Sequence, residues 1–168
     1  MPEKETMERA REDAREGKSP STQAGEFVRE EMDHIREGKH GARSTKQAIA
    51  IGLSKARRAG VELKQPARGK VSSSTSRQAE RDSAKGRTNP NAKPSATRSR
   101  AITLALKKEG HSAASRESLA KQARSSAKKR GAAARKGSAR KAVATKQKEK
   151  KARSGSSNSS NSSPRRAA

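Results

Sequence analysis

The stretch that decides the fold is STKQAIAIGLSKARRAGV, residues 44–61. Ser44 and Gln47 match the S-x-x-Q capping box, in which the serine side chain accepts a backbone N–H at the start of a helix. Gly60 suits the position just after a helix, where the backbone turns left-handed and the next residue closes back on the last turn. The stretch therefore predicts one helix with a defined start and a defined stop.

The apolar face of this helix mixes small and large side chains. Ala48, Gly52 and Ala56 recur every four residues, with Ile49 and Leu53 beside them, and residues four apart share one face of a helix. A glycine inside a helix costs about 1 kcal/mol relative to alanine. Close packing of a second helix would offset that cost, so we predict that Gly52 lies at a helix–helix contact.

The predicted partner helix occupies residues 19–38, SPSTQAGEFVREEMDHIREG. Ser19 suits the N-cap, Pro20 suits the first helical position, and Gly38 ends the segment. The apolar residues recur at helical spacing, and they are Ala24, Phe27, Val28, Met32 and Ile35. Because only the short loop GKHGAR separates the two segments, we predict a helical hairpin over residues 19–65.

The composition leaves little apolar material for a larger core. Leu, Ile, Val and Phe supply 14 of the 168 residues, the net charge is +25, and Trp, Tyr and Cys are absent. A chain with less than roughly 20% of such residues and a high net charge does not bury enough apolar surface to offset the entropy of ordering. We therefore predict a mostly α fold without a sheet, in which one or two small helical hairpins are joined to long disordered basic regions.

The remaining segments differ in composition. Residues 1–18 are nearly all charged and predict a marginal N-terminal helix. Residues 66–96 are rich in Ser, Gly and Pro and predict a flexible linker, with room for a short helix around 76–85. Residues 97–131 predict a second, weaker basic helical segment. Residues 132–168 are Ala/Lys/Arg and Ser low-complexity sequence, which predicts a disordered tail.

Residues 99–110, SRAITLALKKEG, look like a reduced copy of residues 44–61. Both stretches alternate large and small apolar residues. A duplication and a chance similarity of short Ala/Ile/Leu runs both remain open. We expect the helix that follows Gly110 either to dock loosely on this copy or to form only on binding.

Charge is distributed unevenly along the chain. Residues 1–40 hold 8 Lys+Arg and 11 Asp+Glu, whereas residues 41–168 hold 34 and 6, and residues 121–153 hold 14 and 1. A flexible basic segment suits duplex DNA, which carries one charge per about 1.7 Å. The basic region lacks aromatic residues, and this argues against recognition of single strands by base stacking.

These features predict a non-specific, histone-like protein that binds nucleic acid through phosphates, with duplex DNA as the favoured partner and structured RNA as a variant. The alternative is a protein-interaction or stress-protection protein, in which residues 1–65 bind a protein partner. The candidate phosphate contacts are Lys55, Arg57, Arg58, Arg98, Arg100, Lys107, Lys108, Lys121, Arg124, Lys128, Lys129, Arg130, Arg135, Lys136, Arg140, Lys141, Arg165 and Arg166. Simple solvation of an Ala-rich chain is the structural alternative for these residues.

Residues 46–56, KQAIAIGLSKA, resemble a segment R/K-Q-A-I-A-I-A-L-S-x-A that is shared by a group of short, basic, uncharacterised bacterial proteins, with Gly52 in place of the usual alanine. Residues 99–131 are similar to the basic second half of some of them. The resemblance implies a bacterial source and no particular chemistry. The Ala/Lys/Arg tail resembles bacterial linker-histone-like proteins in composition, and SPRR, residues 163–166, resembles the S-P-K/R-K/R turns of linker-histone tails.

Motifs for catalysis are missing from the sequence. The G-x-S-x-G nucleophile elbow, the dinucleotide-binding glycine pattern and a full P-loop are absent, so we predict a non-enzyme without a cofactor. Because Cys and an H-E-x-x-H pattern are absent, we interpret His34, His40 and His111 as solvated surface residues and predict no metal site. Without a bilayer-spanning apolar run or a signal-peptide pattern, we expect a soluble, cytoplasmic, nucleoid-associated protein with no membrane partner.

Overall fold

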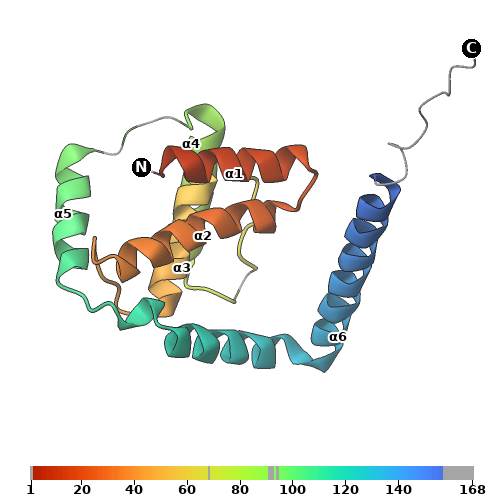
Figure 1. The fold of residues 1–168 in the computed structure, drawn as a ribbon. Helices are drawn as coiled ribbons and strands as arrows, with labels where there is room; N and C mark the ends of the chain where they lie inside the picture. Colours follow the sequence, from red (N-terminus) through yellow and green to blue (C-terminus); the bar gives the residue numbers. More distant parts are fainter. Residues whose placement is uncertain (1, 68, 91–92, 94, 157–168) are drawn as a thin grey trace, which may run out of the picture. The chain divides into compact units, whose positions relative to one another are not determined.

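The computed structural model describes residues 2–67, 69–90, 93 and 95–156 of the chain (Figure 1). Within these residues the protein is mostly helical and has no β-strand, which confirms the predicted mostly α fold without a sheet. The elements are α1 (Lys4–Arg15), α2 (Pro20–Arg36), α3 (Thr45–Arg58), α4 (Ser73–Thr88), α5 (Ala96–Lys107), the 3-10 turn η1 (Ser112–Ala114) and α6 (Arg116–Ser156). The chain divides into two compact units, residues 1–122 and residues 123–168.

The predicted helical hairpin is formed by α2 and α3, which cross in Figure 1. At the start of α3, the backbone N–H of Gln47 donates to the hydroxyl of Ser44 over 3.3 Å. At its end, Gly60 has a φ of +93° and the N–H of Val61 donates to the carbonyl of Ala56 over 3.1 Å. The sequence predictions for both ends of this helix are therefore confirmed.

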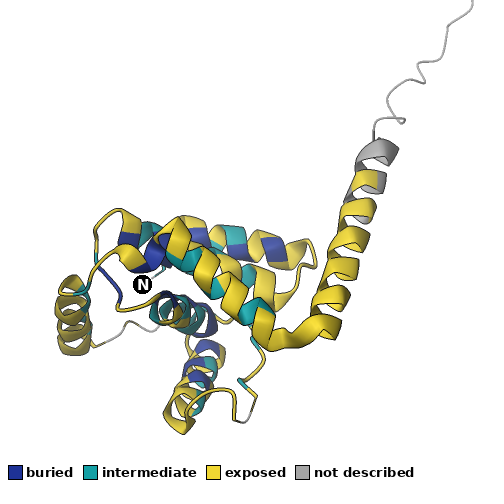
Figure 2. Ribbon diagram, turned by 90° about the horizontal axis from the view of Figure 1, so that it is seen from below, coloured by how far each residue is buried: buried dark blue, intermediate teal, exposed yellow. Residues whose placement is uncertain are grey.

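The core of residues 1–122 is built mostly from small side chains around a few large ones. One buried cluster lies where α2, α3 and η1 meet, and it consists of Met32, Ile35, Ala42, Ala48, Ala113 and Ala114. The other joins α1, α2 and α3, and it consists of Ala10, Ala24, Phe27 and Ala56. Figure 2 shows the buried residues gathered in the helices of this unit. The charged N-terminal segment thus forms a helix that packs on α2 instead of standing alone.

Gly52 lies at the crossing of α2 and α3, as the sequence predicted. A Cβ atom at this position would lie 2.7 Å from the Cα of Val28 and 3.0 Å from the carbonyl oxygen of Phe27. Both of these atoms belong to the backbone of α2, so they cannot move aside as a flexible side chain would. The missing side chain therefore sets how closely the two helices approach.

Replacing Gly52 with alanine is expected to lower the free energy of unfolding by about 1–3 kcal/mol, because overpacking outweighs the better helix propensity. Gly25 in α2 is a matched control, since a Cβ there would meet nothing within 4 Å. Gly25→Ala is expected to stabilise the protein by about 0.5–1 kcal/mol. Urea unfolding followed by circular dichroism measures both changes. Equal stabilisation by the two variants would show that Gly52 is not a packing position.

The range predicted as a flexible linker contains a well-formed helix, α4, that packs on α3. The hydroxyl of Ser72 caps it by accepting the N–H of Thr75 over 3.2 Å. Buried Asp82 accepts a 2.5 Å hydrogen bond from the hydroxyl of Ser54, and a Cβ at Gly86 would clash with the Arg57 carbonyl oxygen. Because polar groups and small residues make this contact, apolar periodicity does not reveal it.

Residues 97–131 are helical in α5 and in the first part of α6, as predicted for a second basic helical segment, but these two helices do not pair into a second hairpin. No residue of α5 is buried, and Ile102 and Leu104 are 52% and 62% exposed. The segment after α5 docks on the first hairpin instead. The Thr45 hydroxyl donates to the Ala113 carbonyl over 2.7 Å, and Leu119 packs against the cluster that contains Met32.

The tail predicted as disordered from residue 132 is helical as far as Ser156. The helix α6 is interrupted at Gly131, whose φ of +75° and ψ of 168° are not helical. Alanine, lysine and arginine are strong helix formers, so a sequence that cannot build a core can still have a high local helix propensity. The rest of the predicted disordered tail, residues 157–168, lies outside the described residues.

Candidate nucleic-acid interface

The basic side chains of α6 are solvent-exposed along the whole part of the helix for which side chains are described. The candidates among them are Lys121, Arg124, Lys128, Lys129, Arg130, Arg135, Lys136, Arg140 and Lys141, and all nine are exposed. Lys121, Arg124 and Lys128 are spaced three and four residues apart, which places them on one face of the helix. This is the largest group of candidate phosphate contacts that one element carries.

The ion pairs between described side chains do not involve these nine residues of α6. The acidic residues of the N-terminal helices pair with basic residues nearby: Arg9 with Glu26 over 2.8 Å and Lys18 with Asp13 over 2.7 Å. The hydrogen bonds that the Lys18 ammonium donates to Asp13 and then to Glu16 raise the pKa of Lys18. The nine candidate residues of α6, by contrast, have no carboxylate within ion-pair distance among the described side chains. Much of the acidic charge of the chain is thus neutralised by these internal pairs, while the basic charge of α6 stays available.

A smaller group of exposed candidates lies on or just after α5. Arg98, Arg100 and Lys107 belong to the helix, and Lys108 follows its last residue. All four side chains are exposed. They belong to the unit of residues 1–122, so this unit also presents basic groups to solvent.

Lys55 does not fit the predicted role of an exposed phosphate contact. Its ammonium lies 2.8 Å from Glu31 Oε2 and 3.0 Å from Glu30 Oε1, and its side chain is only 21% exposed. Burial alone would lower the pKa of Lys55, but the hydrogen bonds and charges of Glu31 and Glu30 outweigh burial and raise it. Lys55 is therefore a fixed counter-charge for two buried carboxylates.

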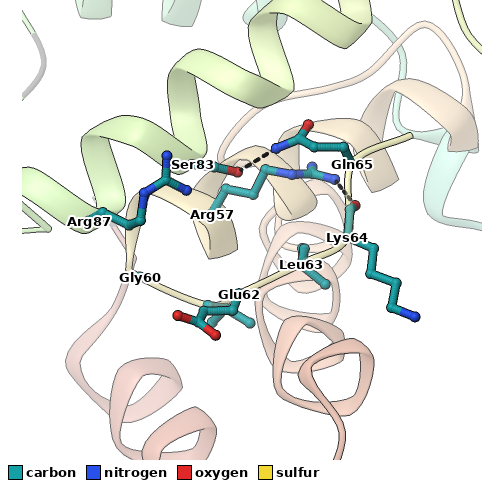
Figure 3. A pocket seen from close by; sticks show the side chains of 9 residues that line it. Arg57, Gly60, Glu62, Leu63, Lys64, Gln65, Ser83 and Arg87 are labelled. Carbon is teal, nitrogen blue, oxygen red and sulfur yellow. Dashed lines mark hydrogen bonds between the residues drawn. The ribbon is translucent and has the colours of Figure 1, made fainter. Parts of the chain in front are cut away.

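Arg57 also differs from the prediction, because it is buried at a cavity of about 260 Å³ between the end of α3 and α4 (Figure 3). Its guanidinium donates to the Lys64 carbonyl over 3.5 Å, while its Nε has no hydrogen-bond partner in the described part of the chain. Burial lowers the pKa of Arg57, and the negative charge of Asp82 opposes this shift. Arg87, from the predicted linker, lines the same cavity. Sequence reasoning missed Arg87 because it did not predict that the helix within residues 66–96 packs on α3.

The last three candidates do not belong to the exposed basic surface that the structure describes. Arg58 is partly buried at the end of α3. Arg165 and Arg166 lie outside the described residues. The exposed part of the predicted interface therefore consists of the basic residues of α5, Lys108 and α6.

The interpretation of His34 and His40 as solvated surface residues is wrong. Their side chains are only 14% and 15% exposed, and their ring centroids lie 6.0 Å apart. Together with buried Glu31 they form a cluster in which one potential ligand atom of each residue lies within 4.8 Å of the others. The spacing Glu31-x-x-His34, which places both residues on one helix face, is the signal that could have indicated it.

Comparison of the chain with protein-family models, with curated proteins and with solved structures found no match. The resemblance of residues 46–56 to a group of bacterial proteins therefore stays a prediction. None of the helices in the described ranges has both the length and the apolar character that crossing a membrane requires.

Proposed function

We propose that this protein is a non-enzymatic, histone-like, nucleoid-associated protein that binds duplex DNA without sequence specificity, through phosphate contacts. The observation that carries the proposal is the exposed basic surface of α6, whose nine candidate residues have no carboxylate partner among the described side chains. A cationic group without an internal partner gains most from a phosphate, since each contact releases a condensed counterion.

The shape of α6 supports backbone binding instead of base reading. Beyond Gly131 the helix continues to Ser156, and 25 helical residues span about 37 Å, close to one turn of duplex DNA. Arg135, Lys136 and Lys141 point in different directions around a helix of 3.6 residues per turn. Sequence reading needs a few side chains held against base edges in a fixed register, whereas phosphate binding does not.

The acidic surface of residues 1–40 also favours DNA binding by the basic helices and not by the N-terminal helices. Its first 40 residues hold more acidic than basic side chains, and most contacts of those carboxylates are internal ion pairs. DNA would be repelled weakly by this surface and attracted by α6 and α5. The proposal therefore places the phosphate contacts at Arg98, Arg100, Lys107, Lys108 and the nine residues of α6.

A titration of full-length protein against fluorescent DNA duplexes of scrambled sequence tests the proposal. Different sequences should bind alike, and log affinity should fall linearly with log salt, with a slope of about −0.9 per phosphate contact. Duplex RNA and an acidic polypeptide in parallel titrations would separate DNA binding from general polyanion binding. If duplex DNA at near-physiological salt binds no better than a neutral control, the proposal fails. A search for a protein partner of residues 1–65 would then take its place.

A further inference from the structure

The cluster of Glu31, His34 and His40 has no part in phosphate binding and combines two imidazoles with a buried carboxylate. Glu31 and His34 are on α2, and His40 is in the loop between α2 and α3. We propose that these three residues form a binding site for a divalent transition-metal cation, with Zn²⁺ as the best fit. Imidazole and carboxylate ligands in such numbers suit zinc, cobalt or nickel better than calcium or magnesium.

The hydrogen bond of His40 fixes which of its nitrogens can face a cation. Its Nδ1 lies 3.1 Å from the Gly41 carbonyl oxygen, and because a carbonyl only accepts, Nδ1 must carry the proton. A neutral ring then presents the lone pair of Nε2 to Glu31 Oε1, 3.4 Å away. Two acceptors that face one another need a cation between them, either a proton on Nε2 or a metal ion.

The distance between these two atoms favours the metal ion. An N–H···O hydrogen bond has a usual length of about 2.7–3.2 Å, which is shorter than the 3.4 Å from His40 Nε2 to Glu31 Oε1. Tetrahedral zinc with bonds of about 2.0–2.2 Å to nitrogen and oxygen holds two ligand atoms about 3.3–3.5 Å apart. This one separation is that of an edge of a tetrahedral zinc site, and the ligand atom of His34 lies within 4.8 Å of the other two.

Glu31 supplies a second, independent observation. The residue is 1% exposed, and its Oε1 has no hydrogen-bond donor among the described residues. The ammonium of Lys55 lies 2.8 Å from Oε2 as an ion pair, which leaves Oε1 turned toward His40. A buried carboxylate oxygen without a donor is costly, and a bound cation would remove that cost.

His34 is held in the same way as His40. Its Nε2 lies 2.9 Å from Glu3 Oε1, and the ammonium of Lys39 donates to the same oxygen over 3.1 Å. A carboxylate oxygen that pairs with an ammonium accepts, so Nε2 of His34 donates to it and Nδ1 is the ring nitrogen left to face a cation. Each histidine thus has an acceptor for one nitrogen, and proteins orient metal-ligating histidines with such partners. With three protein ligands, the fourth position is left for water.

Metal titration of full-length protein, first treated with a chelator, tests the site. One equivalent of Zn²⁺ should bind saturably in calorimetry, raise the melting temperature as its concentration rises, and lose this effect when EDTA is added. Co²⁺ in place of Zn²⁺ should give the intense visible bands of a tetrahedral site. An absence of saturable binding, or octahedral Co²⁺ spectra alone, would overturn the proposal.

Three variants localise the binding. His40→Asn and Glu31→Gln should weaken Zn²⁺ binding at least about tenfold, whereas His111→Asn should leave it unchanged, because His111 is exposed and outside the cluster. Circular dichroism shows whether each variant is folded, and if Glu31→Gln is not, His40→Asn decides. Equal weakening by His111→Asn, or unchanged binding in folded His40→Asn, would overturn the assignment. So would nitrogen-15 spectra that show His40 doubly protonated at neutral pH and unaffected by Zn²⁺.

Discussion

Replacing Lys55 with methionine is expected to lower the free energy of unfolding by about 3–5 kcal/mol, which is the usual cost of removing one partner from a buried ion pair. Methionine keeps the length and flexibility of the side chain, so the loss would come from the charge. Glu30 and Glu31 are 4% and 1% exposed, and without Lys55 two buried negative charges would remain. Glu30 would keep the backbone N–H of Glu3 as a donor, 3.1 Å away.

The free energy of unfolding of this variant should change with pH in the opposite direction to that of the parent protein. In the parent, burial would raise the pKa of Glu30, but the hydrogen bond and charge of Lys55 outweigh burial and lower it. A lowered pKa stabilises the fold above the ordinary pKa of a glutamate, and this stability is lost as the pH falls through the lowered value. In Lys55→Met, burial would raise the pKa of Glu30. Lowering the pH should then protonate this carboxylate and reduce the loss in the free energy of unfolding.

Lys46→Met is the matched control, because Lys46 lies on the same helix, is exposed and makes no ion pair with a described carboxylate. It should change the free energy of unfolding by less than about 0.5 kcal/mol. Urea unfolding at pH 7 and at pH 4 measures both variants. A loss in Lys55→Met no larger than in Lys46→Met would show that the buried pair contributes nothing to stability.

Changing seven basic residues of α6 to glutamine should nearly abolish DNA binding at 200 mM salt. The seven are Lys128, Lys129, Arg130, Arg135, Lys136, Arg140 and Lys141, all exposed. If each contacts a phosphate, the slope of log affinity against log salt should become shallower by about 6. Glutamine is a good helix former, so the helix itself should persist in circular dichroism.

A second septuple variant controls for total charge. It carries glutamine at exposed basic positions of residues 1–122 that form no ion pair with a described carboxylate: Lys4, Arg11, Arg15, Lys46, Lys70, Arg77 and Arg81. Its net charge equals that of the α6 variant, and it should keep most of the salt slope. If the two variants lose the same affinity, the net charge of the whole protein, and not the surface of α6, governs binding.

The features that sequence predicted correctly are those set by local chemistry. The cap at Ser44, the turn at Gly60 and the empty Cβ position of Gly52 each follow from one residue type at one place in a helix. The two ends of α3 were therefore predictable without knowledge of the rest of the fold. So was its partner α2, because it carries the only Phe and the longest apolar stripe.

The features that sequence missed depend on contacts between polar or very small groups. The packing of α4 rests on Asp82 with Ser54 and on Gly86 against a carbonyl, and no hydrophobic pattern marks such contacts. The sequence predicted Lys55 as an exposed cation, because its two carboxylate partners are on a different helix, α2. The sequence predicts no metal site because it lacks Cys and an H-E-x-x-H pattern, and the loop that returns His40 to Glu31 cannot be foreseen from spacing alone.

The dominance of alanine in the core has a thermal consequence. Among the residues that the structure describes, eight of the eleven buried hydrophobic ones are alanines, so unfolding exposes little apolar surface for each residue that it releases. The heat capacity of unfolding comes mainly from newly hydrated apolar surface, at about 0.45 cal/K/mol per Å². A small heat capacity change flattens the curve of stability against temperature. The free energy of unfolding of the helical bundle should therefore fall little on cooling. Its value in the cold should differ little from its value at the temperature of maximum stability.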